Sequence, residues 1–161
     1  MFEQTGIASA EMVLSKFPPI ERIARGRVAL AECYARIPCN PCEDACPFGA
    51  ITVGPDINEM PVVDFDRCVG CGKCVSRCPG LAIMLVDGSV GDGCADIYLP
   101  YEFRPLPAEG DVVAALDRSG AFVCDARVLR VDNSPANDGT PVIRLRIPRS
   151  ELYAVRNISL K

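Results

Sequence analysis

Histidine is absent from this chain of 161 residues, whereas cysteine occurs ten times. The lack of imidazole excludes His-based acid–base catalysis, Cys/His nucleophilic dyads, Rieske centres, His-bearing zinc fingers and haem attachment through a C-x-x-C-H motif. Any metal chemistry in this protein must therefore use sulfur ligands.

Signals for export, membrane insertion and nucleotide binding are also missing. The N-terminus has no positive region followed by an apolar stretch, and the longest uncharged apolar run, residues 81–86, is too short to span a bilayer. No G-x-G-x-x-G or phosphate loop occurs, and a net charge of −4 without a basic stripe argues against nucleic acid. We therefore expect a cytoplasmic protein without a membrane span. In that reducing compartment, closely spaced cysteines favour metal ligation over disulfides.

The middle of the chain contains an internal repeat with an offset of 32 residues. Six residues of the first half recur at this offset in the second half: Cys39, Cys42, Cys46, Pro47, Ala50 and Ile51 match Cys71, Cys74, Cys78, Pro79, Ala82 and Ile83. The sequence of each half predicts a loop that contains cysteines, followed by a short helix and a strand.

The second half contains the pattern C-x2-C-x2-C-x3-C-P, formed by Cys68, Cys71, Cys74 and Cys78. This is the spacing of bacterial ferredoxins, in which three thiolates hold one 4Fe-4S cluster and the fourth reaches a second cluster. Two-residue gaps let successive sulfurs wrap one face of the cube. Glycines at positions 70 and 72 suit a loop that needs unusual dihedrals and a close backbone approach.

The first half has the last three cysteines of this pattern, but the position equivalent to Cys68 is Arg36, which cannot bind iron. The nearest candidate for the missing ligand is Cys33. If Cys33 does not ligate, three thiolates remain, and the site would hold a three-iron cluster or a four-iron cluster with a labile corner.

Crossing the fourth ligands, as the motif requires, predicts two 4Fe-4S clusters. Cluster I would be held by Cys33, Cys39, Cys42 and Cys78, and cluster II by Cys46, Cys68, Cys71 and Cys74. Zinc or disulfides are the alternatives, but neither accounts for the duplicated motif with its trailing prolines. Cys94 and Cys124 lie outside the motif and are expected to be ordinary thiols. Because about fifty residues bury little apolar area, we expect iron removal to unfold this region.

One difference between the halves concerns reduction potential. The first half has Pro38 and Pro41 where the second has Gly70 and Lys73, and proline has no N–H to donate to sulfur. We therefore expect cluster I to be harder to reduce than cluster II.

These patterns predict an α+β fold with three segments. Residues 1–32 form an N-terminal docking arm, residues 33–90 a ferredoxin-like two-cluster domain, and residues 91–161 a small antiparallel β domain for subunit contact. In the arm, Ser9 is expected to cap a helix that ends at Lys16, and residues 28–31 to form a strand. In the β domain, strands are expected over 111–116, 121–131 and 142–147 as a small barrel or sandwich, with exposed arginines at 144, 146, 149 and 156.

Residues 33–87 resemble the bacterial-type two-cluster ferredoxins. A narrower resemblance rests on short motifs along most of the chain: Pro18-Pro19-Ile20-Glu21-Arg22, Glu32-Cys33, Ile37-Pro38-Cys39-Asn40-Pro41-Cys42, Cys46-Pro47-Phe48-Gly49-Ala50-Ile51, Cys78-Pro79-Gly80-Leu81-Ala82-Ile83 and Glu109-Gly110-Asp111. These motifs are similar to those of the small ferredoxin-like subunit of flavin-dependent amino-acid dehydrogenases of the proline and hydroxyproline kind.

The narrower resemblance implies a non-catalytic electron-transfer subunit in a hetero-oligomer with an FAD-containing dehydrogenase subunit, which would oxidise a secondary amine. Two alternatives remain open at this point. One is a free ferredoxin that carries electrons between separate enzymes, and the other is a structural or regulatory protein whose clusters only stabilise the fold. Arm and tail together exceed the cysteine core in length, which favours a docking role for them.

Overall fold

The structure is a computed structural model that describes residues 2–161. Within this range the chain forms short helices: α1 (Phe2–Thr5), α2 (Ala10–Lys16), α3 (Ile20–Ile23), α4 (Pro41–Asp44), α5 (Lys73–Arg77), and the 3₁₀ turns η1 (Pro135–Asn137) and η2 (Arg149–Glu151). Its strands are β1 (Val28–Ala31), β2 (Ile51–Thr52), β3 (Val62–Val63), β4 (Ile83–Asp87), β5 (Cys94–Pro100), β6 (Val112–Leu116), β7 (Phe122–Asp132), β8 (Val142–Pro148) and β9 (Asn157–Ser159). None of the described helices has the length and apolar character needed to span a membrane.

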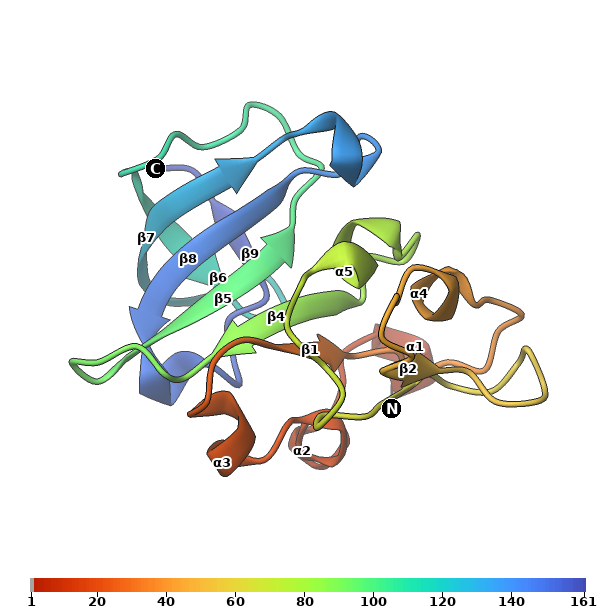
Figure 1. The fold of residues 1–161 in the computed structure, drawn as a ribbon. Coiled ribbons are helices and arrows are strands. Elements are labelled where there is room, and N and C mark those ends of the chain that lie inside the picture. Colours follow the sequence, from red (N-terminus) through yellow and green to blue (C-terminus); the bar gives the residue numbers. More distant parts are fainter. Residues whose placement is uncertain (1) are drawn as a thin grey trace.

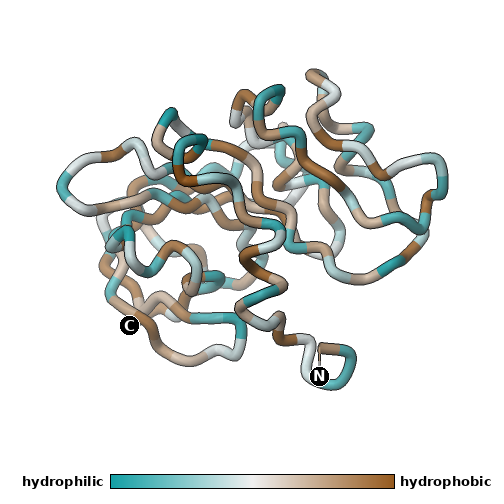
Figure 2. The backbone as a smooth tube through the Cα atoms, turned by 90° about the horizontal axis from the view of Figure 1, so that it is seen from below, coloured by the Kyte–Doolittle hydropathy of each residue, from teal (hydrophilic) through white to brown (hydrophobic). Residues whose placement is uncertain are grey.

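One antiparallel sheet of seven strands organises the molecule, in the order β1-β4-β5-β8-β7-β6-β9. The α4 and α5 helices and the small β2–β3 sheet lie on one side of β1 and β4, and α2 and α3 lie below them in Figure 1. Teal, hydrophilic residues mark several peripheral loops in Figure 2, where the tube is seen from below. The α+β prediction is compatible with this arrangement, although strands dominate.

The β1 and β4 strands are buried on both faces, which explains their uninterrupted apolar sequences. Leu30 and Met84 point into the main core of the sheet, together with Val28 and Val86. Alternate residues point the other way, into a second core beside the cysteines: Ala29, Ala31, Ile83 and Leu85. The two strands therefore separate the two cores and contribute to each of them.

The N-terminal arm forms the predicted helix and strand. The Ser9 side chain accepts a hydrogen bond from the Met12 N–H at 3.2 Å and caps α2, which ends at Lys16 as expected. Val13 and Phe17 bury their side chains against the main core. β1 occupies the predicted residues 28–31 and pairs with β4, so the arm contributes the edge strand of the sheet.

The C-terminal segment is less separate than the sequence predicted. The expected strands form as β6, β7 and β8 with boundaries shifted by about one residue, but β5 and β9 were not expected. β5 pairs with both β4 and β8 and thereby joins the cysteine-rich segment to the tail. A single sheet therefore includes strands from all three segments expected from the sequence.

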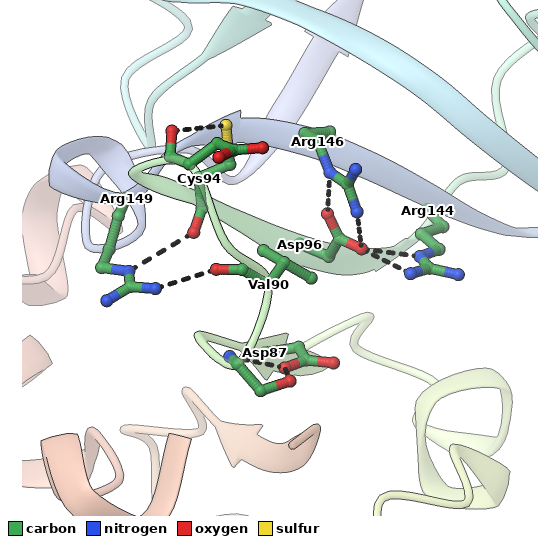
Figure 3. A network of polar contacts seen from close by, with 9 residues as sticks. Asp87, Val90, Cys94, Asp96, Arg144, Arg146 and Arg149 are labelled. Atoms are coloured by element: carbon green, nitrogen blue, oxygen red, sulfur yellow. Dashed lines mark hydrogen bonds and ion pairs between the residues drawn. The ribbon is translucent and has the colours of Figure 1, made fainter. Parts of the chain in front are cut away.

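The tail arginines that were expected to be exposed differ from one another: Arg149 is exposed, whereas Arg144 and Arg146 are only partly exposed, because the tail binds their side chains. Asp96 is fully buried on β5 and accepts hydrogen bonds from Arg144 at 2.6 Å and from Arg146 at 2.8 Å (Figure 3). Arg149 donates to the carbonyl oxygens of Gly88 and Val90 and holds the glycine-rich turn between β4 and β5. These contacts neutralise a buried carboxylate and fix a turn.

A buried ion-pair cluster joins the arm to the tail. The Glu32 carboxylate accepts hydrogen bonds from Arg156 at 2.8 Å and from Arg118, and the exposed fractions of the Glu32 and Arg156 side chains are only 8% and 6%. Burial raises the pKa of Glu32, but the hydrogen bonds from both guanidinium groups outweigh it, so the pKa lies below its usual value. Arg156, predicted to be exposed, is thus a buried ion-pair partner.

We expect Glu32→Gln to destabilise the fold strongly, because it leaves buried guanidinium charge without a counter-ion. Breaking a buried pair costs about 3–5 kcal/mol, which corresponds to a fall in melting temperature of about 10 °C. Thermal melting of anaerobically prepared protein by circular dichroism measures the change. Asp125→Asn, which breaks the exposed pair with Lys161 (57% and 50% exposed), is the matched control and should cost about 0–1 kcal/mol. Equal melting temperatures for the two variants would contradict a stabilising role for the cluster.

Candidate metal centre

Eight of the ten cysteines surround two separate cavities, in the two crossed sets expected from the sequence. One cavity, here called cavity I, is lined by Cys33, Cys39, Cys42 and Cys78. The other, cavity II, is lined by Cys46, Cys68, Cys71 and Cys74. Each half of the repeat thus contributes three thiols to one cavity and one thiol to the other. Cys94 and Cys124 line neither cavity.

The lining of both cavities fits an iron–sulfur cube. Apart from the thiols, cavity II is lined mainly by apolar side chains such as Ala29, Ile51 and Leu85, and cavity I by Ile37, Pro61 and Ile83, with one carboxylate, Glu59. Within residues 2–161, no three Cys, Asp or Glu side chains converge closely enough to hold a single metal ion. The thiols surround a space, which suits a cluster whose irons are bound at its corners.

The loop into cavity II depends on glycine. Gly70 has φ +68° and Gly72 has φ +83°, a left-handed conformation that side chains rarely adopt. A Cβ atom at Gly70 would lie 2.4 Å from the carbonyl oxygen of Arg27, so the loop passes directly against the residue before β1. Gly72 then starts α5, which buries Cys74. The positive φ angles agree with the conformational demand expected from the sequence, whereas the contact with Arg27 was not expected.

The first half reaches a similar geometry with different residues. Pro41 occupies the first position of α4, where its missing N–H is tolerated, and Cys42 is buried in this helix. After each helix, a left-handed residue turns the chain toward the next strand: Gly49 with φ +59° in the first half and Leu81 with φ +52° in the second. These two positions differ by the repeat offset, so the duplication is visible in the backbone as well.

Backbone N–H groups donate to three of the candidate sulfurs. Ala50 donates to Cys46 Sγ at 3.3 Å, and Ala82 donates to Cys78 Sγ at 3.4 Å, as expected for equivalent positions of the repeat. A third donor comes from β1, where the Ala29 N–H lies 3.4 Å from Cys68 Sγ. Among the described residues, cavity II thus receives two of these bonds and cavity I receives one.

The protonation of the thiols reflects their crowding in apolar surroundings. Burial raises the pKa of Cys74 to about 12, with further contributions from Cys68 and Cys71. Burial also raises the pKa of Cys42 to about 11, and Cys78 adds to this rise. Four thiolates in such a cavity need a compensating positive charge, which iron would supply.

Arg22 supports the cysteine loop, a role that sequence reasoning missed. Its guanidinium donates to the carbonyl oxygens of Phe65 at 2.7 Å and Cys68 at 2.6 Å, and also to those of Gly26 and Arg27. It therefore ties the start of β1 to the loop that enters cavity II. Arg22 belongs to one of the short motifs singled out in the sequence, but no spacing rule indicates that it bonds carbonyl oxygens.

Comparison with known families agrees with this geometry. Residues 35–82 match the model of the 4Fe-4S dicluster domain. The chain therefore contains a 4Fe-4S dicluster domain. Cys33 lies two residues outside the matched range, whereas the seven other candidate ligands lie inside it.

Several curated proteins are similar to part of this chain. The ferredoxin-type protein NapF of Haemophilus influenzae is 44% identical over 54 residues, which cover 32% of this chain and 31% of the relative. The Na(+)-translocating ferredoxin:NAD(+) oxidoreductase complex of Acetobacterium woodii has a subunit that is 47% identical over 45 residues, 28% of this chain and 13% of the relative. The sulfite dehydrogenase of Allochromatium vinosum has a subunit that is 46% identical over 39 residues, 24% of this chain and 16% of the relative.

Each of these matches covers less than a third of this chain. This chain spans less than a third of the length of each of these relatives. No solved structure matches the chain.

Gly70→Ala is expected to impair cavity II selectively. The added Cβ cannot coexist with the Arg27 carbonyl oxygen, so the loop carrying Cys68 and Cys71 must move. Iron in anaerobically prepared protein should then fall by about half, from about eight to about four atoms per chain. Gly91→Ala is the control, because its φ is not positive and its new Cβ would meet no heavy atom within 4 Å. Full iron content in Gly70→Ala would show that the close approach is not needed.

Proposed function

We propose that this protein is an iron–sulfur electron carrier that holds two 4Fe-4S clusters. In this proposal, Cys33, Cys39, Cys42 and Cys78 bind cluster I, and Cys46, Cys68, Cys71 and Cys74 bind cluster II. The single observation that carries the proposal is that eight cysteines line two cavities in these two sets of four. The match to the 4Fe-4S dicluster domain supports the identity of the cofactor.

When bound, each cluster supplies a reversible one-electron couple. The residues of this chain bind it, exclude water and set its potential. Four thiolates per cavity leave no iron corner free for a substrate, which favours electron transfer over catalysis. Apolar neighbours such as Ile51 and Ile83 limit solvent access, and the N–H donors of Ala29, Ala50 and Ala82 stabilise sulfur charge.

We propose that this protein works as a subunit of a multi-subunit oxidoreductase. Two of the relatives are named as subunits of redox enzymes, which supports a hetero-oligomer. The narrower sequence resemblance points to a partner that contains FAD and oxidises an amino acid of the proline or hydroxyproline kind. In this setting the chain has no substrate of its own and passes electrons from the flavin subunit to an acceptor, in the cytoplasm.

The second candidate is a free ferredoxin that carries electrons between separate enzymes. The relative named as a ferredoxin-type protein supports this alternative. Purification from the native host separates the two functions, because only a subunit should remain bound to a flavoprotein. A flavin absorbance that co-elutes with this chain would favour the complex, and its absence would favour the free carrier.

Iron content and reducibility test the proposal directly. Anaerobically prepared protein should contain about eight irons per chain and show a broad visible absorbance that dithionite bleaches reversibly. Cys94→Ser should leave both values unchanged, because Cys94 lines neither cavity. Protein that binds zinc in place of iron, or iron that does not change oxidation state, would refute an electron-transfer role.

Cysteine variants test the crossed ligand sets and the order of the potentials. Cavity II receives two N–H···S bonds and cavity I one, which supports the expectation that cluster I is harder to reduce. In EPR-monitored redox titrations, Cys33→Ser should alter the signal with the lower potential, and Cys71→Ser the signal with the higher potential. If Cys33→Ser leaves both signals unchanged, Cys33 is not a ligand. The opposite assignment of the two signals would reverse the proposed order.

A further inference from the structure

A groove of about 810 Å³ lies between the dicluster domain and the large sheet. One wall comes from α4 and α5, and the other from β5, β7, β8 and the η1 turn. Figure 1 shows α5 between α4 and the sheet, and α5 contacts β4, β5 and η1. The groove therefore forms only where the tail folds back against the cysteine-rich segment.

The groove is positively charged although the chain as a whole has a net charge of −4. Two carboxylates line it, Asp44 and Asp132, against five cations: Arg27, Lys73, Arg77, Arg130 and Arg144. Cations therefore outnumber carboxylates along this groove on a chain that is acidic as a whole.

Three of these cations are available to a ligand. Arg77 pairs with Asp138, and Arg144 pairs with Asp96. Within residues 2–161, Arg27, Lys73 and Arg130 are exposed and form no ion pair within 4.0 Å. Their charges come from the residue before β1, from α5 and from β7, so they are distributed over three separate elements.

The Tyr98 ring restrains two of the guanidinium groups that line the groove. The Tyr98 ring of β5 has the Arg27 guanidinium 5.7 Å from its centroid and the Arg144 guanidinium 5.4 Å from its centroid. Because cation–π contacts restrain both guanidinium groups, they reduce the conformational entropy that ligand binding would cost.

The groove borders directly on cavity II. Cys71 is the exposed member of the eight candidate ligands, and it lines both spaces. Gly72, Lys73 and Leu85 also line both. A molecule seated in the groove would therefore touch the thiol that the proposed function assigns to cluster II, without any intervening layer of protein.

We propose that this groove is the docking site for an acidic segment of a one-electron redox protein, and that electrons pass between that protein and cluster II beside Cys71. The inference rests on the proposed electron-transfer function and adds the site and the charge of the partner. One electron leaves the reduced centre and is gained by the oxidised one, and no bond or proton changes place. The size of the groove and the spread of its free cations fit an extended acidic chain better than a single small anion.

Binding of a fluorescein-labelled hexaglutamate peptide to the full-length, iron-loaded protein tests the docking site. At about 50 mM NaCl we expect measurable binding by fluorescence anisotropy, with loss at higher salt. Combined substitution of Arg27→Gln, Lys73→Gln and Arg130→Gln should weaken binding by about tenfold. Arg127→Gln is the matched control, because Arg127 is an exposed, unpaired cation on the same strand that does not line the groove. Equal affinities for the triple variant and this control would overturn the proposal.

Competition with inorganic phosphate separates an acidic chain from a small anion. Phosphate at matched ionic strength should displace the peptide no better than NaCl does. Displacement at much lower phosphate concentration, together with weak peptide binding, would identify a small-anion site and overturn the proposal.

A kinetic measurement tests the link to cluster II. After reduction by dithionite, oxidation by the anion ferricyanide should be slowed by about tenfold in the triple variant, and oxidation by the cation hexaamminecobalt(III) should not be slowed. Unchanged ferricyanide rates would show that electrons do not leave cluster II through the groove and would overturn the proposal. The peptide measurement needs no redox activity, so protein that lacks reducible iron would refute the electron-carrier function while leaving the docking surface testable.

Discussion

The structure depends on one constraint: two strands, β1 and β4, must be buried on both faces at once. One face of the pair packs into the main core of the large sheet, and the other face packs into the second core, beside the cysteines. On the second face, the small side chain of Ala29 lines cavity II, and the Ala29 N–H donates a hydrogen bond to Cys68 Sγ. Residues of β1 and β4 therefore pair in the sheet and fill both hydrophobic cores, and Ala29 of β1 also donates a hydrogen bond to a cysteine sulfur.

Arginine side chains hold the segments around this wall together. Arg22 bonds four backbone carbonyl oxygens and connects the arm to the loop at Cys68. Arg156 and Arg118 bind Glu32, which directly precedes Cys33. Apart from the bonds of Arg22 to Gly26 and Arg27, these contacts are long-range in sequence, so segments outside the dicluster domain support the residues next to both cavities. The tail therefore supports the residues next to the cysteines and also forms one wall of the groove.

Sequence reasoning was most successful where chemistry restricts the choice of residue. The spacing of Cys68, Cys71 and Cys74 is the one expected of thiolates around a 4Fe-4S cube. The two cavities are lined by the sets of thiols that the repeat predicted. The Ser9 cap and the strand at 28–31 were also predicted, since capping and apolar runs are local signals. Cys33 does not fit the repeat and was predicted only because it is the cysteine nearest to Arg36, which occupies the position equivalent to Cys68.

The remaining features depend on tertiary pairing, which leaves a weak signal in one sequence. β5 was not expected, although Ala95, Ile97 and Leu99 alternate into the main core. The buried carboxylate between the first two, Asp96, is explained only by Arg144 and Arg146 on the neighbouring strand. The same pairing engages these arginines in ion pairs and leaves them only partly exposed. Arg156 was misjudged for a similar reason, because its partner Glu32 lies at the other end of the chain.

The pairing of β4 with β5 means that the cysteine-rich half is not a detachable module. A fragment that ended before Cys94 would expose the β4 backbone amides and carbonyls that β5 now satisfies, along with Met84 and Val86. Open strand edges of this kind recruit other chains. The second half of the polypeptide therefore keeps the cysteine-rich half soluble by covering the edge of β4.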